Sequence, residues 1–464
     1  MPSLNLSAIS PIDGRYNKST AVLSPIFSEK GLMRYRLIVE GEYLIALSEE
    51  KTKLRKISPK EKQIIRKLYN LSDNDAQIIR DIEIKGYKNI KATDHDVKAV
   101  EYYMKDKLNN TSLKDILEWI HFGLTSEDIN NIAYALMLRD GTELLIKKLQ
   151  EIIKEINKLA KQNAKLPMLA RTHGQSASPT TFGKEMKVFA NRLDRGLDHL
   201  FGQNILAKLN GATGNYNAHY VAYPKIDWLK FSKNFITSLN KLEPKTLQLE
   251  PNLITTQIEP HDSYIELFDR FKRMNTMLID FNQDMWRYIS DEWIIQRPIE
   301  GTVGSSTMPH KINPIKFENS EGNLGMANAM FEFFARKLPI SRLQRDLSDS
   351  TVQRNFGTAY AHSYIAYEYL LKGLSVISVN DKRVKEVLEN HVEVIAEAIQ
   401  TILRREGEAF PYEKLKALTR GKHVTIREFK EFIAELPVSE KVKKELNDIT
   451  SLNYTGLASK IAML

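Results

Sequence analysis

Apolar residues recur at the spacing of an α-helix over long stretches of this chain. Between residues 126 and 165, for example, Leu149 and Ile156 fall on one apolar face, with charged residues between them. Similar patterns run over residues 180–209, 261–295, 319–337 and 350–377. Alternation with a period of two is rare. The pattern predicts an all-α fold built on long helices, the first of them either continuous or broken near Gly141.

Shorter helical segments with polar breaks flank these long stretches. We therefore expect three parts: an N-terminal helical domain (1–123), a central long-helix bundle (124–378) and a C-terminal helical domain (379–464). The Glu-Pro sequences near Leu242 and at Glu250 predict a loop between helices. Because helices this long cannot cover their own apolar faces, we also expect a homo-oligomer.

The composition agrees with long elements and removes several classes of chemistry. The chain has 464 residues but only 21 Gly and 16 Pro, so turns should be few. It has no cysteine, which excludes disulfides, thiolate metal sites and a cysteine nucleophile. No signal-like N-terminus appears, and no apolar run approaches the roughly 20 residues of a membrane span. We expect a cytoplasmic protein without a membrane partner.

The formal net charge of +9 is compatible with nucleic acid or with small anionic substrates. Lysines such as Lys147 and Lys154 are spread through amphipathic segments, as on solvated helix faces, and no nucleic-acid-binding motif is recognisable. We therefore expect no nucleic-acid partner. The charge is better explained by solvated surface and by attraction of an anionic small molecule.

The densest group of chemically useful side chains lies at residues 304–314, which read GSSTMPHKINP. Gly304 allows close backbone approach to a ligand, and Ser305 and Ser306 place hydroxyls beside consecutive N–H groups. Lys311 adds a charge and Asn313 an amide that donates and accepts. On composition alone an ordinary surface loop reads the same way. The alternative is an anion-binding catalytic loop.

Other polar clusters have equally plain alternative readings. His173 lies in a Thr-His-Gly-Gln turn, and histidine is a residue type suited to general acid catalysis, although a lone loop histidine is usually unremarkable. The sequence TSED at residues 125–128 is a good helix start, and helix N-termini also bind anions. The arginines of residues 345–354 suit a phosphate but also a solvated charge run. The ten histidines are scattered without metal-ligand spacing, and no dinucleotide fingerprint or P-loop occurs, so we expect no metal and no cofactor.

Together these motifs resemble the fumarase/aspartase superfamily, and the Pro-His-Lys centre at residues 309–311 resembles its adenylosuccinate lyase branch. The motifs follow the family order from Ser10 to at least Lys422. The resemblance implies a helical homotetramer whose active sites draw on three subunits. It also implies the elimination of fumarate from adenylosuccinate, giving AMP, and from the succinylated imidazole-carboxamide ribotide of purine synthesis, giving its amide.

Such an elimination needs a base, an acid and a cradle for the negative charge that builds on a carboxylate. The resemblance assigns the base to Ser305, activated by Lys311, and the acid to His173, oriented by Glu318; His95 is a candidate to share the acid role. The substrate-binding residues that it implies are Arg15, Tyr16, Asp96, Thr125, Ser126, Thr172, Gln257, Ser306, Met308, Asn313, Arg345, Ser350 and Arg354. Among these, Arg345, Ser350 and Arg354 would hold the nucleotide phosphate.

Two departures from the family pattern affect local detail. Ser176 stands where proline is common, and Asp94 stands where close relatives carry a neutral residue, but neither change removes a catalytic group. Sister enzymes acting on argininosuccinate, malate or aspartate share the catalytic loop, so only the nucleotide-binding clusters separate them from this chain. A catalytically idle helical scaffold and a basic nucleic-acid-binding protein are the alternatives from other classes.

Overall fold

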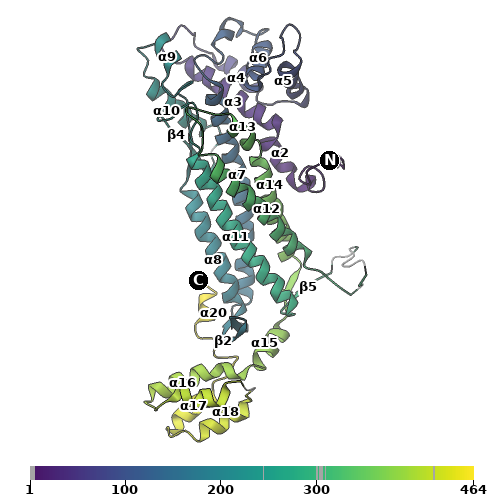
Figure 1. Cartoon of the computed structure of the whole chain (residues 1–464), viewed down its shortest axis with the longest axis vertical. Coiled ribbons are helices and arrows are strands. Elements are labelled where there is room, and N and C mark those ends of the chain that lie inside the picture. The colour runs from purple at the N-terminus through teal and green to yellow at the C-terminus, as the bar shows by residue number, and fades with distance from the viewer. Residues whose placement is uncertain (1–5, 244, 299–300, 302–306, 309, 422–423) are drawn as a thin grey trace. The chain divides into compact units, whose positions relative to one another are not determined.

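The computed structural model describes residues 6–243, 245–298, 301, 307–308, 310–421 and 424–464. Five long helices carry the fold: α7 (Ser126–Gln162), α8 (Phe182–Phe201), α11 (Asp262–Ser290), α12 (Ile315–Lys337) and α14 (Phe356–Leu374) (Figure 1). The predicted all-α class is confirmed. No described helix is both long enough and apolar enough to cross a membrane.

Helix α7 continues without a break through Gly141. This glycine lies under the ring of Phe27, and a Cβ at Gly141 would come within 2.5 Å of that ring. The missing side chain therefore allows another segment to approach closely. Of the two predictions for this stretch, the single continuous helix is the one that the structure confirms.

One compact unit, unit 1, comprises Met1–Lys148, Gly196–Thr276 and Gly322–Glu368. Its core is rich in aromatic rings: Phe268 of α11 lies 5.4 Å from Phe331 of α12 and 5.1 Å from Phe356 of α14, measured between ring centroids. Its other helices are α1 (Asn17–Thr20), α2 (Ser24–Phe27), α3 (Glu29–Leu47), α4 (Pro59–Lys67), α5 (Asp73–Ile84), α6 (Asp96–Leu108), α9 (Asn217–Ala222), α10 (Trp228–Leu239) and α13 (Ser348–Gln353), with 3-10 turns at Ala21–Leu23 and Lys114–Trp119.

The second compact unit, unit 2, comprises Leu149–Arg195, Met277–Glu321 and Tyr369–Leu464. Within it, Phe189 of α8 packs edge-on against Phe281 of α11 at 5.2 Å, and Asn282 donates a 3.0 Å hydrogen bond to Ser320 of α12. Its shorter helices are α15 (Asp381–Glu389), α16 (Ala396–Arg405), α17 (Pro411–Thr419), α18 (Ile426–Ala434), α19 (Glu440–Asn447) and α20 (Ala458–Ile461), with a 3-10 turn at Val392–Ile395.

These two units divide the chain differently from the three predicted ranges. Each unit collects three separate stretches of sequence, because the long helices contribute residues to both. Helix α7, for example, belongs to unit 1 up to Lys148 and to unit 2 from Leu149. The division into 1–123, 124–378 and 379–464 stays a prediction.

Six short strands form three two-stranded sheets among the described residues. An antiparallel hairpin joins β1 (Pro167–Thr172) to β2 (Gln175–Thr181), and β5 (Ile294–Gln296) pairs with β6 (Ile377–Val379), also antiparallel. The third pair, β3 (Asn204–Ala207) with β4 (Gln248–Pro251), is parallel. The loop predicted around Glu250 is therefore wrong. Leu249 is buried, and the side chain of Asn240 bonds both its N–H and its carbonyl, which holds the segment extended.

Candidate active site

The first turns of α6 and α7 bring two of the predicted site residues together in unit 1. His95 is the N-cap of α6, where its Nδ1 accepts from the backbone N–H of Lys98 at 3.3 Å. This capping bond leaves Nε2 directed outward, 3.2 Å from the Oγ of Ser126 at the start of α7. His95 is thus fixed by its own helix and aimed at the first residue of the next one.

A buried ion pair holds the segments that carry Thr125 and Gln257. Asp128 and Lys208 are both fully buried, with Nζ 3.1 Å from Oδ1. Asp128 also accepts from the backbone N–H of Thr125 at 2.9 Å. Lys208 donates to the carbonyl of Gln257 at 2.7 Å. Asp128 and Lys208 thus bond to each other and to the backbone of Thr125 and Gln257. A small shift of this ion pair would therefore move both of these predicted substrate-binding residues.

The side chain of Gln257 has a partner in this structure. Its Nε2 donates to the carbonyl of Ala212 at 3.1 Å. The amide oxygen is the part of Gln257 that this bond leaves to receive a hydrogen bond from a ligand. The same loop is held from the other side by the N–H of Gly211, which donates to Asp128 at 3.2 Å.

Arg345 lies against two buried carboxylates, Glu127 and Asp349. Its Nη2 is 3.0 Å from Glu127 Oε2 and 3.5 Å from Asp349 Oδ1. Burial raises the pKa of Glu127 to about 8, and the charge of Arg345 lowers it too little to cancel that effect. Burial likewise raises the pKa of Asp349. At neutral pH Glu127 is therefore mostly protonated, and Arg345 keeps a positive charge that this residue does not neutralise.

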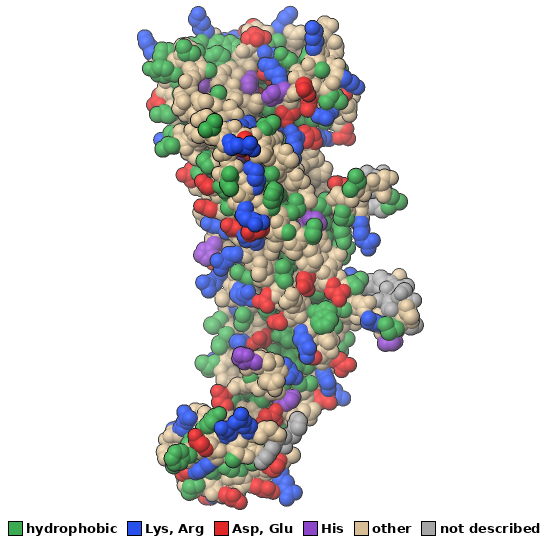
Figure 2. Space-filling view, in the orientation of Figure 1, with side chains coloured by type: hydrophobic (Ala, Val, Ile, Leu, Met, Phe, Trp, Pro, Cys, Tyr) green, Lys and Arg blue, Asp and Glu red, His purple; other side chains and the backbone are tan. Residues whose placement is uncertain are grey.

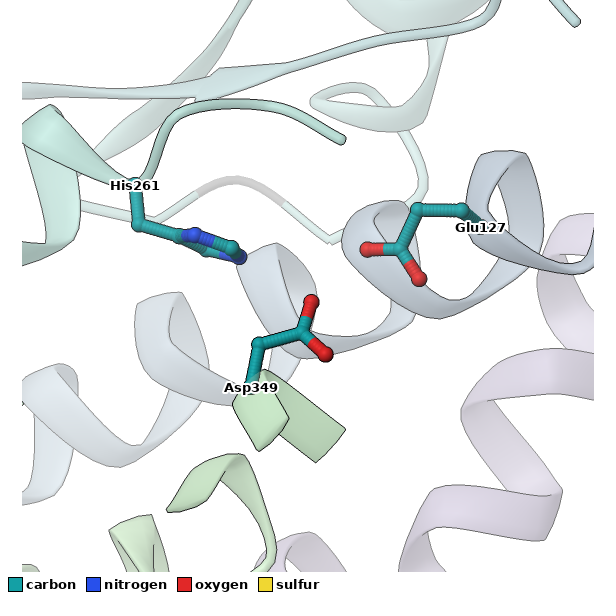
Figure 3. Close-up of side chains that lie close together, drawn as sticks. All are labelled: Glu127, His261 and Asp349. Carbon is teal, nitrogen blue, oxygen red and sulfur yellow. The ribbon is translucent and has the colours of Figure 1, made fainter. Parts of the chain in front are cut away.

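His261 completes a cluster with these two carboxylates, and Figure 3 shows the three side chains converging from different segments. Their ligand atoms lie within 4.8 Å of one another, as a metal site would require. Two contacts favour a metal-free network instead. The guanidinium of Arg345 already lies on both carboxylates, and Nε2 of His261 is 2.8 Å from the amide nitrogen of Gln353. We therefore assign no metal to this cluster.

Arg354, the residue after α13, takes part in a second charged group. Its Nη2 donates to Oδ2 of Asp96 at 2.6 Å, and Arg36 donates to the same oxygen at 2.7 Å. Burial alone would raise the pKa of Asp96, but the charges of Arg36 and Arg354 outweigh it and hold the pKa at about 2. Asp96 is thus ionised throughout the neutral range and fixes the direction of the Arg354 side chain.

A cavity of about 630 Å³ in unit 1 brings the N-terminal motif close to Arg354. Ser10 and Asp13, from the predicted nucleotide-binding segment, line the cavity together with Arg354 and Thr358. Within this segment Arg15 is exposed and Tyr16 is the N-cap of α1. The cavity therefore brings Ser10 and Asp13 close to Arg354, although Arg15 and Tyr16 are not among the residues that line it. Ser350 sits between the two arginines, within the short helix α13.

His173 and Thr172 lie in unit 2, at the tip of the hairpin between β1 and β2. Thr172 is the last residue of β1, and His173 and Gly174 form the turn with φ of +53° and +75°. Positive φ at both central residues is the geometry of a tight two-residue β-hairpin turn, so the hairpin itself accounts for the backbone of His173. Both residues are exposed. This turn therefore presents the histidine to solvent, where a ligand or another chain can reach it.

Two further predicted catalytic residues, Glu318 and Lys311, also belong to unit 2. Glu318, in the first turn of α12, accepts from the indole N–H of Trp286 at 3.1 Å, and no hydrogen bond joins it to His173 in the described part of the chain. Its pairing with His173 stays a prediction. Lys311 and Met308 are exposed, and Asn313 is half-buried. Ser305 and Ser306 lie outside the described residues.

The buried groups that support the site carried little signal in the sequence. Glu127 and Asp128 stand inside a motif that a helix start explains fully, and Lys208 belongs to none of the sequence motifs. The one available clue was a lysine between Ala207 and Leu209, just before a glycine turn. A lysine in such an apolar stretch predicts either a strand edge or a buried ion pair, and only the fold decides between them.

The family models that match this chain cover most of its length. A lyase family model matches residues 14–330, and the model described as adenylosuccinate lyase C-terminal matches residues 341–455. The two matches follow each other along the sequence. They include every predicted site residue, from Arg15 to Arg354.

Curated relatives match almost from end to end. The adenylosuccinate lyase of Haemophilus influenzae is 47% identical over 461 residues, covering 98% of both chains. Those of Escherichia coli and Dictyostelium discoideum are 46% and 47% identical, each covering 98% of this chain and 97% of the relative.

Solved structures of low sequence identity share the fold. A fumarate lyase from Mesorhizobium sp. BNC1 has a TM-score of 0.73 at 18% identity, covering 95% of this chain and 96% of its own. The 3-carboxy-cis,cis-muconate lactonizing enzyme of Pseudomonas putida has a TM-score of 0.70, also at 18% identity, covering 96% of this chain and 95% of its own. These similarities establish the fold alone. On the family models and the near full-length relatives together, the chain belongs to the adenylosuccinate lyase family.

Proposed function

We propose that this chain eliminates fumarate from adenylosuccinate, giving AMP, and from the succinylated imidazole-carboxamide ribotide, giving its amide. The observation that carries the proposal is the 47% identity over 98% of the chain to an adenylosuccinate lyase. The fold by itself would not suffice, because a lactonizing enzyme shares it. The substrate is thus a small nucleotide, and the reaction cleaves a carbon–nitrogen bond.

The chemistry divides between a base and an acid. In this proposal Ser305 removes the proton beside the succinyl carboxylate, assisted by the positive charge of Lys311, and His173 protonates the departing nitrogen. His173 is a suitable donor because its turn leaves the imidazole exposed. His95 is the second candidate for the acid, since its Nε2 is directed at Ser126 and away from its own helix.

The nucleotide phosphate would bind where Arg345 and Arg354 flank α13. Two features of the described residues support this placement. Glu127, the closer carboxylate of Arg345, is mostly protonated at neutral pH, so the positive charge of Arg345 remains available. Arg354 lines a cavity of about 630 Å³ together with hydroxyl-bearing residues, and arginine binds phosphate oxygens in pairs.

The assembly that we propose is a homotetramer with active sites shared between chains. The exposed position of His173 supports this arrangement, since a catalytic acid needs neighbours that the tip of its own hairpin does not supply. Large apolar side chains are also exposed on long helices: Trp286 of α11 is 45% exposed, and Met326 and Phe333 of α12 are 53% and 49% exposed. Such residues are typical of surfaces that another subunit covers.

Charge placement favours a small anionic substrate over nucleic acid. On the face shown in Figure 2, Lys and Arg side chains alternate with Asp and Glu, whereas a nucleic-acid-binding surface gathers positive charge. The proposal keeps the sequence-based expectation of a cytoplasmic enzyme. It also keeps the expectation that the reaction needs no added cofactor.

The direct test is fumarate release by the purified protein, with adenylosuccinate, argininosuccinate, malate and aspartate offered in separate reactions without added metal. We expect release from adenylosuccinate only. Release from another of the four would keep the elimination but contradict the nucleotide assignment. If none of the four yields fumarate, the catalytically idle scaffold becomes the better explanation.

A further inference from the structure

A carboxylate of this chain already occupies the arginine that the proposed function assigns to the phosphate. Nη1 of Arg354 donates to both oxygens of Glu29, at 2.9 and 2.7 Å. Glu29 is the first residue of α3, far from Arg354 in the sequence. Both bonds come from one nitrogen of the guanidinium, and they are charge-assisted bonds of the kind that arginine also makes to phosphate oxygens.

The charges around Arg354 balance only when Glu29 is included. Asp96 accepts from both Arg36 and Arg354, so one negative charge serves two positive ones. Arg36 is almost fully buried, at 2% side-chain exposure, and cannot turn to solvent for another partner. Without Glu29 this group would carry one net positive charge. An incoming phosphate could supply the missing negative charge in its place.

The position of Glu29 allows it to separate from Arg354. Its side chain is 48% exposed and that of Arg354 is 37% exposed, so water can solvate both when they separate. Exposed ion pairs of this kind contribute little stability. Arg354 also retains its bond to Asp96, which keeps the guanidinium in position when Glu29 moves away.

A plainer role for Glu29 is stabilisation of α3 through the positive end of its helix dipole, which favours an acidic first turn. That role needs no partner on another element and does not explain the two short bonds from Nη1 of Arg354 to Glu29. It also does not explain why this contact lies beside a cavity, lined by Arg354 and Ser28, that is large enough for part of a nucleotide.

We propose that Glu29 is a placeholder: it occupies Arg354 in the empty site and gives way to the phosphate of the nucleotide. The inference rests on the proposed function for the identity of that phosphate. In this role Glu29 competes with every anion for Arg354. It weakens the binding of all of them, and only an anion with enough charge to displace Glu29 binds well.

Glu29→Gln tests this idea, because glutamine keeps the shape and removes the charge. Titration calorimetry of the assembled protein with inorganic phosphate should show binding about five-fold tighter than in the unchanged protein, the factor expected for loss of one exposed ion pair. Asp73→Asn is the matched control. Asp73 pairs at 2.6 Å with Lys30, the residue that follows Glu29 in the sequence. The Asp73→Asn change therefore removes one negative charge, as Glu29→Gln does, without touching Arg354. Its phosphate affinity should not change.

Equal phosphate affinities in the Glu29 and Asp73 variants would overturn the inference, and so would weaker binding in Glu29→Gln, since that would make Glu29 a support for Arg354. Arg354→Gln separates this failure from failure of the proposed function. If phosphate binds equally well without Arg354, the proposed phosphate position is wrong. If binding depends on Arg354 but not on Glu29, only the placeholder role is wrong.

Discussion

At the scale of single residues, the feature with the largest effect on charge is the burial of Glu127 beside Arg345. An ion pair is the usual expectation for a carboxylate 3.0 Å from a guanidinium. Here burial raises the pKa of Glu127 to about 8, because the cost of burying the charge, helped by the negative charges of Asp349 and Asp128, outweighs the positive charges of Arg345 and Lys208. The protonated acid is the main form at neutral pH.

This protonation makes stability depend on pH in a defined direction. In the unfolded chain the pKa of Glu127 lies near its ordinary value of 4.5, whereas in the folded protein burial raises this pKa to about 8. Between these values the folded state binds more protons, so the free energy of unfolding falls as pH rises. In Glu127→Gln this fall in the free energy of unfolding with rising pH is absent. Relative to the unchanged protein, we expect the variant to gain on the order of 2 kcal/mol between pH 6 and pH 8, measured by denaturant unfolding.

Glu61→Gln is the control for this experiment. Glu61 is also buried beside an arginine, Arg55, whose hydrogen bonds lower the pKa of Glu61 to about 2. Glu61 is therefore ionised in both states above pH 6, and its replacement should change stability equally at pH 6 and pH 8. A Glu127 variant that behaves in the same way would mean that Glu127 and Arg345 form an ordinary ion pair.

At the scale of elements, the turn before α7 decides where the first residues of that helix lie. Gly123 has a φ of +72°, and a Cβ there would come 2.9 Å from Nε2 of His219. That nitrogen is already bonded to the hydroxyl of Tyr43 at 2.9 Å, and His219 is buried, so the ring has little room to move. The glycine is required by both the backbone angle and the space.

Gly123→Ala should therefore destabilise the protein by about 1–3 kcal/mol and also lower kcat/KM, because Thr125 and Ser126 follow directly. Thermal unfolding and steady-state kinetics would measure the two effects. Gly202→Ala provides the comparison: its Cβ would meet nothing within 4 Å, so we expect a change within about 0.5 kcal/mol and normal activity. Normal kinetics in the Gly123 variant would show that the turn does not position the site.

The helices themselves were predictable because helical periodicity is a local property of the sequence. The helical character of residues 126–162 and of α11 follows from apolar spacing, although that spacing did not decide between a continuous helix and one broken near Gly141. Strand β4 was not predictable, since its extended shape depends on Asn240 and on pairing with β3. The role of Lys208 was not predictable for the same reason, because its ion pair depends on contacts that exist only in the folded chain. The sequence indicated which polar motifs belong to the site but not the buried ion pair that holds Thr125 and Gln257.

At the scale of the whole molecule, the proposed site needs more than one chain. We therefore expect His173→Gln and Ser305→Ala each to lower turnover by orders of magnitude, while mixtures of the two inactive proteins, dissociated and reassembled, regain a measurable fraction of activity. Some sites in mixed tetramers would receive an unchanged histidine from one chain and an unchanged serine from another. Fumarate release by the reassembled mixture is the measurement.

Two controls make this result specific. Each variant dissociated and reassembled alone should stay inactive, and sedimentation should show that both form the same oligomer as the unchanged protein. If the mixture stays as inactive as its components although hybrids form, His173 and Ser305 act within one chain and the proposed sharing of sites is wrong.

The contact between Phe27 and Gly141 also bears on the order of events during synthesis. Phe27 packs against Gly141 and Gly357, where a Cβ would come within 2.5 Å of its ring and of its own Cβ respectively, and its ring lies 4.9 Å from that of Tyr360. The packing site of Phe27 is therefore incomplete until the ribosome has added Tyr360. Phe27 is thus synthesised more than 300 residues before the last of these partners, so a nascent chain must keep it exposed, and available to chaperones, over that interval.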